Sequence, residues 1–244
     1  MSPHDFRADL IVKNMQTKIR KRYFTNGEII LWSTSVIMLV LSFIIFQGEN
    51  YLTLIASILG VTSLIFCAKG NPIGQFLMII FSSFYGFISY TARYYGEMMT
   101  YLGMTLPMAI FVFVSWLRHP FKGKRSEVEV YHVKKKDLFL MAVLAVLVTV
   151  VFYFILKHFN TANLIPSTVS VATSFIAVYL TFLRSPYHAL GYAVNDVVLI
   201  VLWVLASLSD ASYISVVVCF VVFLVNDLYG FINWKRMERR QKSD

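Results

Sequence analysis

Long apolar runs alternate with short polar or basic segments along nearly the whole chain. A helix needs about 20 apolar residues to cross a bilayer core of ~30 Å. Eight runs have this length, at residues 29–46, 51–68, 73–90, 98–116, 138–156, 167–183, 187–208 and 213–233. The pattern therefore predicts an all-α polytopic membrane protein with eight transmembrane helices.

The composition supports this interpretation, and the placement of the charges predicts the orientation of the chain in the membrane. Of the 244 residues, 58% are hydrophobic and 14% are charged, against roughly 25% charged residues in a soluble domain. The net charge of +9 would also suit nucleic-acid binding. If the N-terminus is cytoplasmic, however, 20 of the 22 Lys and Arg residues fall on the cytoplasmic side, and only Arg93 and Lys157 fall outside. This positive-inside bias predicts a plasma (inner) membrane protein with both termini cytoplasmic, and it argues against nucleic acid as a partner.

The segments outside the spans are basic. In the N-terminal segment, apolar residues recur at helical spacing among the cations, which fits either an amphipathic helix on the inner leaflet or a disordered basic arm. Trp32, Trp116 and Trp234 fall near cytoplasmic span ends, where we expect them to anchor the helices at the lipid headgroups.

Sequence signals for catalysis or for a bound metal are absent. Cys67 and Cys219 both lie inside predicted spans, and the five His residues are scattered, so neither a disulfide framework nor a metal site is indicated. The chain also contains no Gly-rich phosphate loop, no HExxH and no GxSxG. We therefore expect no metal, no cofactor and no enzyme activity.

An internal repeat organises the spans. Spans 2–4 and spans 6–8 each contain a short cationic turn ending in proline, Lys69–Pro72 and Arg184–Pro186, and each unit closes on a Trp followed by basic residues. Because each unit has three spans and one further span separates them, both units enter the membrane in the same orientation. Parallel repeats of this kind place a substrate near the bilayer midplane, between the units.

The repeat predicts a 3+1+3 layout with one additional N-terminal helix. Its parts are a basic cytoplasmic segment (1–27), the additional helix (28–46), repeat 1 (51–116), a basic cytoplasmic loop (117–137), a linker helix (138–156), repeat 2 (167–234) and a basic cytoplasmic tail (235–244).

Two Asn-Asp pairs stand out inside apolar spans of repeat 2. Asn195 and Asp196 lie ~13 Å from the cytoplasmic end of their span, and Asp227, which follows Asn226, lies ~10 Å inside the interface. A carboxylate at such depth costs at least ~2.5 kcal/mol. These side chains therefore face the bundle interior, where they either line a substrate pathway or hydrogen-bond neighbouring helices together.

From these considerations we take nine candidate substrate-binding residues. They are Tyr192, Asn195, Asp196, Trp203, Asn226 and Asp227 in repeat 2, and Gln75, Tyr85 and Tyr101 in repeat 1. The last three also fit other roles, interfacial for Gln75 and helix packing for the two tyrosines. Pro107 is expected to kink its span, mainly for packing.

The order of these landmarks resembles the PnuC-type nicotinamide riboside transporters. The similar stretches are the KGN turn, SFYGFISY followed by YYGEMMTYLGMTLPM, the basic central loop, GYAVNDVV and YGFINWKR, and they extend from about Thr25 to the end of the chain. The resemblance implies a full-length SWEET-like fold, a homotrimer, and facilitated diffusion of a non-phosphorylated vitamin that a cytosolic kinase then traps. Many relatives read Trp-x-x-x-Asp where this chain has Tyr192-Ala-Val-Asn195-Asp196, so thiamine and riboflavin, whose carriers share the scaffold, stay open as substrates.

Nicotinamide riboside, an NAD precursor, is a pyridinium cation that carries a ribose. We expect Asp196 and Asp227 to stabilise the cation, tyrosines and Trp203 to stack on the ring, and the asparagines to bind the sugar. The expected mechanism is alternating access between the two repeats. The alternatives are a carrier of another vitamin, a SWEET-type sugar carrier, an ion or proton channel, and a membrane scaffold.

Overall fold

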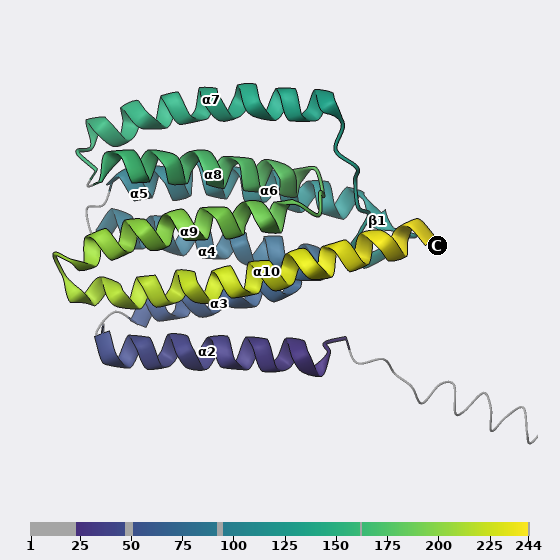
Figure 1. Cartoon of the computed structure of the whole chain (residues 1–244), viewed down its shortest axis with the longest axis horizontal. Helices are drawn as coiled ribbons and strands as arrows, with labels where there is room; N and C mark the ends of the chain where they lie inside the picture. The colour runs from purple at the N-terminus through teal and green to yellow at the C-terminus, as the bar shows by residue number, and fades with distance from the viewer. Residues whose placement is uncertain (1–22, 47–50, 92–94, 162, 244) are drawn as a thin grey trace, which may run out of the picture. The chain divides into compact units, whose positions relative to one another are not determined.

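The computed structural model describes residues 23–46, 51–91, 95–161 and 163–243 (Figure 1). Its elements are α2 (Asn26–Phe46), α3 (Tyr51–Ala68), α4 (Pro72–Thr91), α5 (Tyr95–Thr100), the π-helix η1 (Tyr101–Thr105), α6 (Leu106–Arg118), β1 (Pro120–Phe121), β2 (Lys124–Val128), α7 (Lys135–His158), α8 (Leu164–Phe182), α9 (His188–Ser207), the 3-10 helix η2 (Ala211–Tyr213) and α10 (Ile214–Ser243). Within these ranges, eight helices are long and apolar enough to cross a membrane, with α5, η1 and α6 together counted as one of them. This confirms the predicted all-α, eight-span architecture.

Two basic segments are more ordered than the sequence suggested. The 117–137 loop contains an antiparallel hairpin of β1 and β2. The 235–244 tail continues α10 as far as Ser243, because hairpin and helix bind each other: the Gln241 side chain accepts from Val130 N (2.8 Å) and donates to Val128 O (3.0 Å). The amphipathic helix considered for the N-terminal segment falls on residues that lie outside the described ranges.

The chain divides into two compact parts, and the first ends at Leu31. In this first part, a capping box fixes the start of α2. Thr25 N donates to the Glu28 carboxylate (2.7 Å), and Glu28 N donates to the Thr25 hydroxyl (3.2 Å). The reciprocal bonds satisfy two amides that would otherwise lack helical partners.

The second part, from Trp32 onward, holds both three-helix units. Within each unit the middle helix packs on both others: α4 contacts α3 and α6, and α9 contacts α8 and α10. Between the units, the first helix of one packs against the third helix of the other, in the pairs α3–α10 and α6–α8. The linker helix α7 lies along α8 at an edge of the bundle (Figure 1).

The cationic turns of the two units have the same backbone geometry. Gly70 and Arg184 both adopt left-handed conformations, with φ of 64° and 57°. Each donates its N–H to the carbonyl three residues earlier, and the next residue, Asn71 or Ser185, donates to the carbonyl five residues earlier. This is the Schellman arrangement that ends a helix. The short sequence repeat therefore corresponds to a repeated three-dimensional motif.

The chain from the last residue of β2 onward joins the two turns. Val128 N donates to the carbonyl of Gly70 (2.9 Å), and Tyr131 N donates to the carbonyl of Arg184 (3.1 Å). The Arg184 side chain donates in turn to Glu129 O (3.1 Å), which compensates for a left-handed conformation at a residue other than glycine. Partial burial lowers the pKa of Arg184, although guanidinium groups stay protonated near neutral pH.

Trp116 and Trp234 are buried between the units, so the prediction that they anchor in lipid headgroups was wrong. Both are 0% exposed, with ring centroids 5.6 Å apart. Trp116 Nε1 donates to Thr181 O (2.9 Å) and Trp234 Nε1 donates to Cys67 O (2.8 Å). Each Trp thus closes its own unit and binds the first helix of the other unit. We call this pair the Trp layer, and the side of the bundle that carries it and the hairpin the hairpin end.

Candidate substrate-binding cavity

A cavity of about 720 Å³ extends from the end opposite the hairpin into the middle of the bundle. Its mouth is formed by the start of α5, the α7–α8 connection and the α9–α10 connection, and its inner part by residues of α3, α4, η1 and α8–α10. Both three-helix units and the linker therefore contribute to one site.

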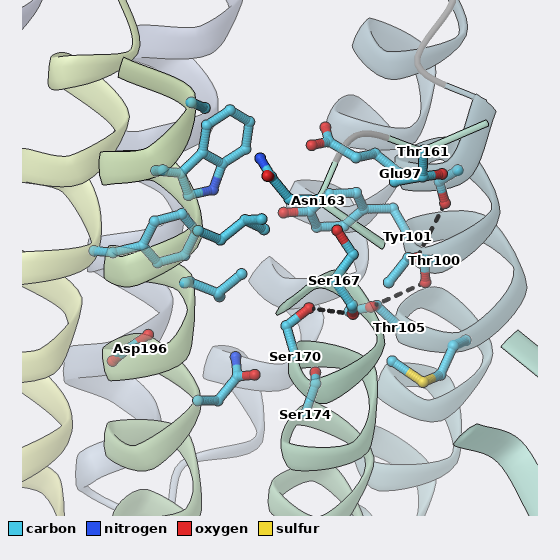
Figure 2. A pocket seen from close by; sticks show the side chains of 18 of the residues that line it. Glu97, Thr100, Tyr101, Thr105, Thr161, Asn163, Ser167, Ser170, Ser174 and Asp196 are labelled. Carbon is cyan, nitrogen blue, oxygen red and sulfur yellow. Dashed lines mark hydrogen bonds between the residues drawn. The ribbon is translucent and has the colours of Figure 1, made fainter. Parts of the chain in front are cut away.

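Two carboxyl groups lie at the inner end of the cavity. Asp196 on α9 and Asp227 on α10 are 4% and 7% exposed, and both line the cavity. Asp196 Oδ2 has no hydrogen-bond partner among the described residues. Figure 2 shows the Asp196 carboxyl group beside the cavity. An acidic oxygen is thus available there to a bound group.

The α9 wall follows from helical spacing. Asn195 and Asp196 lie three and four residues after Tyr192. Leu199 lies three residues after Asp196, and Trp203 lies four residues after Leu199. This spacing places all five along one face, and all of them line the cavity. The Asn195 side-chain oxygen accepts a hydrogen bond of 2.7 Å from Thr173 on α8, which orients its amide.

The opposite wall is shaped by the π-helix η1. Pro107 has no N–H to donate, and its ring clashes with the carbonyl four residues earlier, so the regular α-helical pattern cannot continue through it. At the preceding residue, Leu106 N donates to Tyr101 O, five residues back, which is the π-helical spacing. The wider turn presents Tyr101, Met104 and Thr105 to the cavity. We expected the irregularity at Pro107 to serve packing, but it forms part of the cavity wall, as π-turns often do at functional sites.

Asn226 does not line the cavity, although its neighbour Asp227 does. Successive residues of a helix point about 100° apart. Asn226 Nδ2 therefore points the other way and donates to the Ser35 hydroxyl of α2 (2.9 Å) and to Val222 O (2.8 Å). Here the structure places Asn226 in a contact between helices.

Tyr85 and Gln75 also lie outside the cavity lining. The Tyr85 ring packs against that of Tyr101, with centroids 5.0 Å apart. Gln75 Nε2 donates to the sulfur of Cys67 (3.2 Å), close to the Trp layer. Of the nine candidates, the cavity brings together Tyr101, Tyr192, Asn195, Asp196, Trp203 and Asp227.

The sequence analysis missed a polar stripe on α8 and a carboxylate on α5. Asn163, Ser167, Ser170 and Ser174 follow one another at intervals of four, three and four residues and line the cavity in Figure 2. That spacing is visible in the sequence, but the sequence analysis took no candidate from the 167–183 span. Glu97 lies just before the predicted 98–116 span, so it was not among the carboxylates found inside spans.

The lining defines the chemistry that the cavity can accommodate. Its described residues include the carboxylates of Glu97, Asp196 and Asp227 and contain no Lys, Arg or His. Aromatic faces are supplied by Tyr101 and Trp203, and hydroxyl and amide groups by α8. Acidic and aromatic groups attract an organic cation, and the hydroxyl and amide groups suit a polyhydroxylated ligand. Among the described residues, no three His, Cys, Asp or Glu side chains are grouped to hold a metal ion.

Comparison with known proteins relates this arrangement to a family. Residues 50–236 match the model of a family described as nicotinamide mononucleotide transporters. A nicotinamide riboside transporter PnuC from Neisseria mucosa is 29% identical over 202 residues, which are 80% of this chain and 76% of that protein. A protein of the same name from Haemophilus influenzae is 22% identical over 228 residues, which are 90% of this chain and 96% of that protein.

A solved structure has the same fold. The crystal structure of the vitamin B3 transporter PnuC matches with a TM-score of 0.75 at 25% sequence identity, over 89% of this chain and 94% of that chain. With eight helices in the described ranges able to cross a membrane, the protein is a multi-pass membrane transporter and not an enzyme. Because the family model extends over most of the chain, the protein belongs to the nicotinamide mononucleotide transporter family.

Proposed function

We propose that the protein imports nicotinamide riboside across the plasma membrane by facilitated diffusion. The observation that carries the proposal is the cavity lining, in which three carboxylates and several aromatic rings meet without a basic residue among the described positions. The pyridinium ring is a cation, so Asp196 and Asp227 would stabilise its charge while Trp203 and Tyr101 offer their ring faces. The relatives named as nicotinamide riboside transporters support the same substrate.

The same lining favours the riboside over its phosphorylated form. A mononucleotide carries a phosphate, which proteins bind with Arg, Lys or backbone amides at helix N-termini. In this cavity the phosphate would instead meet Glu97, Asp196 and Asp227 without a described cation to balance them. Like charges at short range in a partly buried site repel strongly. We therefore assign the non-phosphorylated nucleoside as substrate.

The hairpin end is assigned to the cytoplasm. Lys122, Lys124 and Arg125 are exposed on the hairpin, and the Lys and Arg distribution along the chain follows the positive-inside pattern. The cavity mouth then opens to the outside, so the structure corresponds to an outward-facing state. The Trp layer closes the route to the cytoplasm.

We take the 3+1+3 arrangement of helices to be SWEET-like. In alternating access, the two three-helix units would move relative to each other. The α3–α10 and α6–α8 contacts and the two Trp hydrogen bonds are among the connections between the units. Rocking one unit against the other would break these contacts at the hairpin end and close the mouth. We further propose a homotrimer, and a cytosolic kinase that traps the substrate, both on the basis of the family resemblance.

Uptake by purified protein in liposomes tests the function. Nicotinamide riboside, its mononucleotide, thiamine, riboflavin and glucose would each be supplied as labelled substrate, with and without a proton ionophore. We expect saturable, ionophore-insensitive uptake of nicotinamide riboside alone. Uptake of another vitamin or of glucose would reassign the substrate, and ionophore-sensitive uptake would replace facilitated diffusion with coupled transport. Conductance without saturable uptake would indicate a channel.

A further inference from the structure

We infer that Glu97 is a specificity-determining residue, an outer carboxylate that captures a cationic pyridinium nucleoside before it reaches the Asp196–Asp227 pair. The inference rests on the proposed function and extends it to a residue that the comparisons do not assign. It is carried by three observations: the direction of the Glu97 side chain, its lack of a basic partner among the described residues, and its position along the cavity.

The Glu97 side chain is held toward the cavity. Figure 2 shows its carboxylate pointing into the space between the two walls. Its neighbour Gly96 packs directly against the α7–α8 connection, where an added Cβ would lie 2.2 Å from Thr161 Oγ1. Thr100 and Tyr101, three and four residues after Glu97, line the same wall. The close approach at Gly96 and the helical spacing together fix the direction of Glu97.

No basic side chain in the described ranges forms an ion pair with Glu97. The ion pairs found there instead join acidic residues to the C-terminal part of α10 at the hairpin end, Glu127 with Arg240 and Glu238 with Lys235 and Lys242. The basic residue at the nearby end of α7, Lys157, lies over the Tyr153 ring at 5.9 Å. The Glu97 carboxylate can therefore form its ion pair with a cation that enters the cavity.

The acidic and aromatic groups are staggered along the route inward. Glu97 is two residues from the start of α5, ~3 Å of helix from the open end. On the opposite wall, Trp203 lies four residues before the end of α9, ~6 Å in, and Asp196 lies eleven residues before that end, ~16 Å in. An entering cation meets a carboxylate first, then aromatic faces, and then the buried Asp196–Asp227 pair.

This order gives Glu97 a role that the inner pair cannot perform. A cleft of one sign with low-dielectric walls concentrates ions of the opposite sign and speeds their entry. Because Glu97 stands at the mouth, it acts on capture, whereas Asp196 and Asp227 act on the bound state. Removing the outer charge should thus lower the efficiency of uptake at low substrate concentration and leave the maximal rate nearly unchanged.

The test compares a cationic with a neutral substrate of the same shape. Nicotinamide riboside and its reduced dihydro form, which lacks the pyridinium charge, would be taken up by liposomes containing wild type, Glu97→Gln or Asp210→Asn. Asp210 is a matched control because it is an exposed carboxylate at the same end and outside the cavity lining. Its pKa is lowered by the hydrogen bond from Ser212 N, so it is ionised at neutral pH, and asparagine retains the cap.

We expect Glu97→Gln to raise KM for the cation about tenfold at low salt, less at high salt, and to change KM for the neutral form less than about twofold. Asp210→Asn should change neither. Equal effects on both substrates, or no effect on either, would overturn the inference while leaving the proposed function standing. If wild type took up no nicotinamide riboside, the proposed function itself would fail. A thermal unfolding midpoint equal to that of wild type would establish that the variant is folded.

Discussion

Neighbouring polar residues on one helix have separate roles in this protein. Asn226 binds Ser35 while Asp227 faces the cavity. On α9, Asn195 and Asp196 both line the cavity, but Asn195 is fixed by Thr173 whereas Asp196 keeps an oxygen without a described partner. The sequence shows that such residues must be buried, since lipid would penalise them. Which of them is free to bind a ligand depends on partners from distant helices.

Asp196→Asn should weaken binding of nicotinamide riboside. Interactions with a charged group contribute about 1.5–3 kcal/mol, so the loss corresponds to a Kd about tenfold to a hundredfold higher. Isothermal titration on the detergent-purified protein measures this. Asn226→Ala is the control, and we expect it to lower the thermal unfolding midpoint with little change in Kd. If the two variants affected Kd equally, the placement of Asn226 outside the site would be contradicted.

Gly70→Ala should destabilise the protein. A left-handed conformation costs about 1–2 kcal/mol at a residue with a Cβ, and the added atom would lie 3.1 Å from Met237 Cε and 3.2 Å from Val128 Cγ1. We expect a lower unfolding midpoint, measured by differential scanning fluorimetry in detergent. Gly27→Ala is the matched control, because its Cβ would have only one contact, at 4.0 Å. An unchanged midpoint for Gly70→Ala would contradict the claim that this turn has no room for a Cβ at Gly70.

At the scale of elements, the spans could be read from the chain because lipid imposes a length and an apolar composition on each. The π-helix η1 and the hairpin could not. Pro107 predicts a break in the helical hydrogen-bond pattern. Whether the helix kinks there or forms a wider π-helical turn depends on the packing around it. The hairpin is short and basic, and its order comes from partners such as Gly70 and Gln241, which are far away in sequence.

Pro107→Ala tests the role of the π-helix. Alanine restores an N–H and favours a regular α-helix, which would turn the α5 side chains by about 100° relative to α6. Tyr101 and Glu97 would leave the cavity wall. We expect Kd for nicotinamide riboside to rise about tenfold while the unfolding midpoint stays the same or increases. A Kd equal to that of wild type would indicate that the wider turn has no part in binding.

At the scale of the molecule, the repeat was visible as two short turns and two closing Trp residues, and the structure gives the pattern a geometric basis. Gly70 and Arg184 have matching dihedral angles, and Cys67 and Thr181, each five residues before the proline of its turn, accept the two Trp hydrogen bonds. What the sequence could not reveal is that each Trp bonds to the opposite unit. A Trp near the end of a span fits an interfacial anchor equally well until the neighbouring helices are known.

The Trp layer leads to a prediction about the whole transport cycle. Trp234→Phe removes the bond to the Cys67 carbonyl and should weaken the hairpin end by about 1 kcal/mol. Opening of that end would expose the thiol of Cys67, which is 8% exposed in the closed structure. In a Cys219→Ser background, where Cys67 is the only thiol, we expect several-fold faster labelling by a maleimide.

The matched control is Trp32→Phe, because Trp32 also donates one hydrogen bond, to Thr62 at 3.1 Å, but is 37% exposed and lies outside the Trp layer. That variant should label at the rate of the parent. Saturating nicotinamide riboside should change the labelling rate of Trp234→Phe, since a transported substrate must shift the balance between the two states. Equal rates in all three proteins would show that the two Trp bonds do not hold the cytoplasmic side closed, and the gate would have to be sought in the hairpin instead.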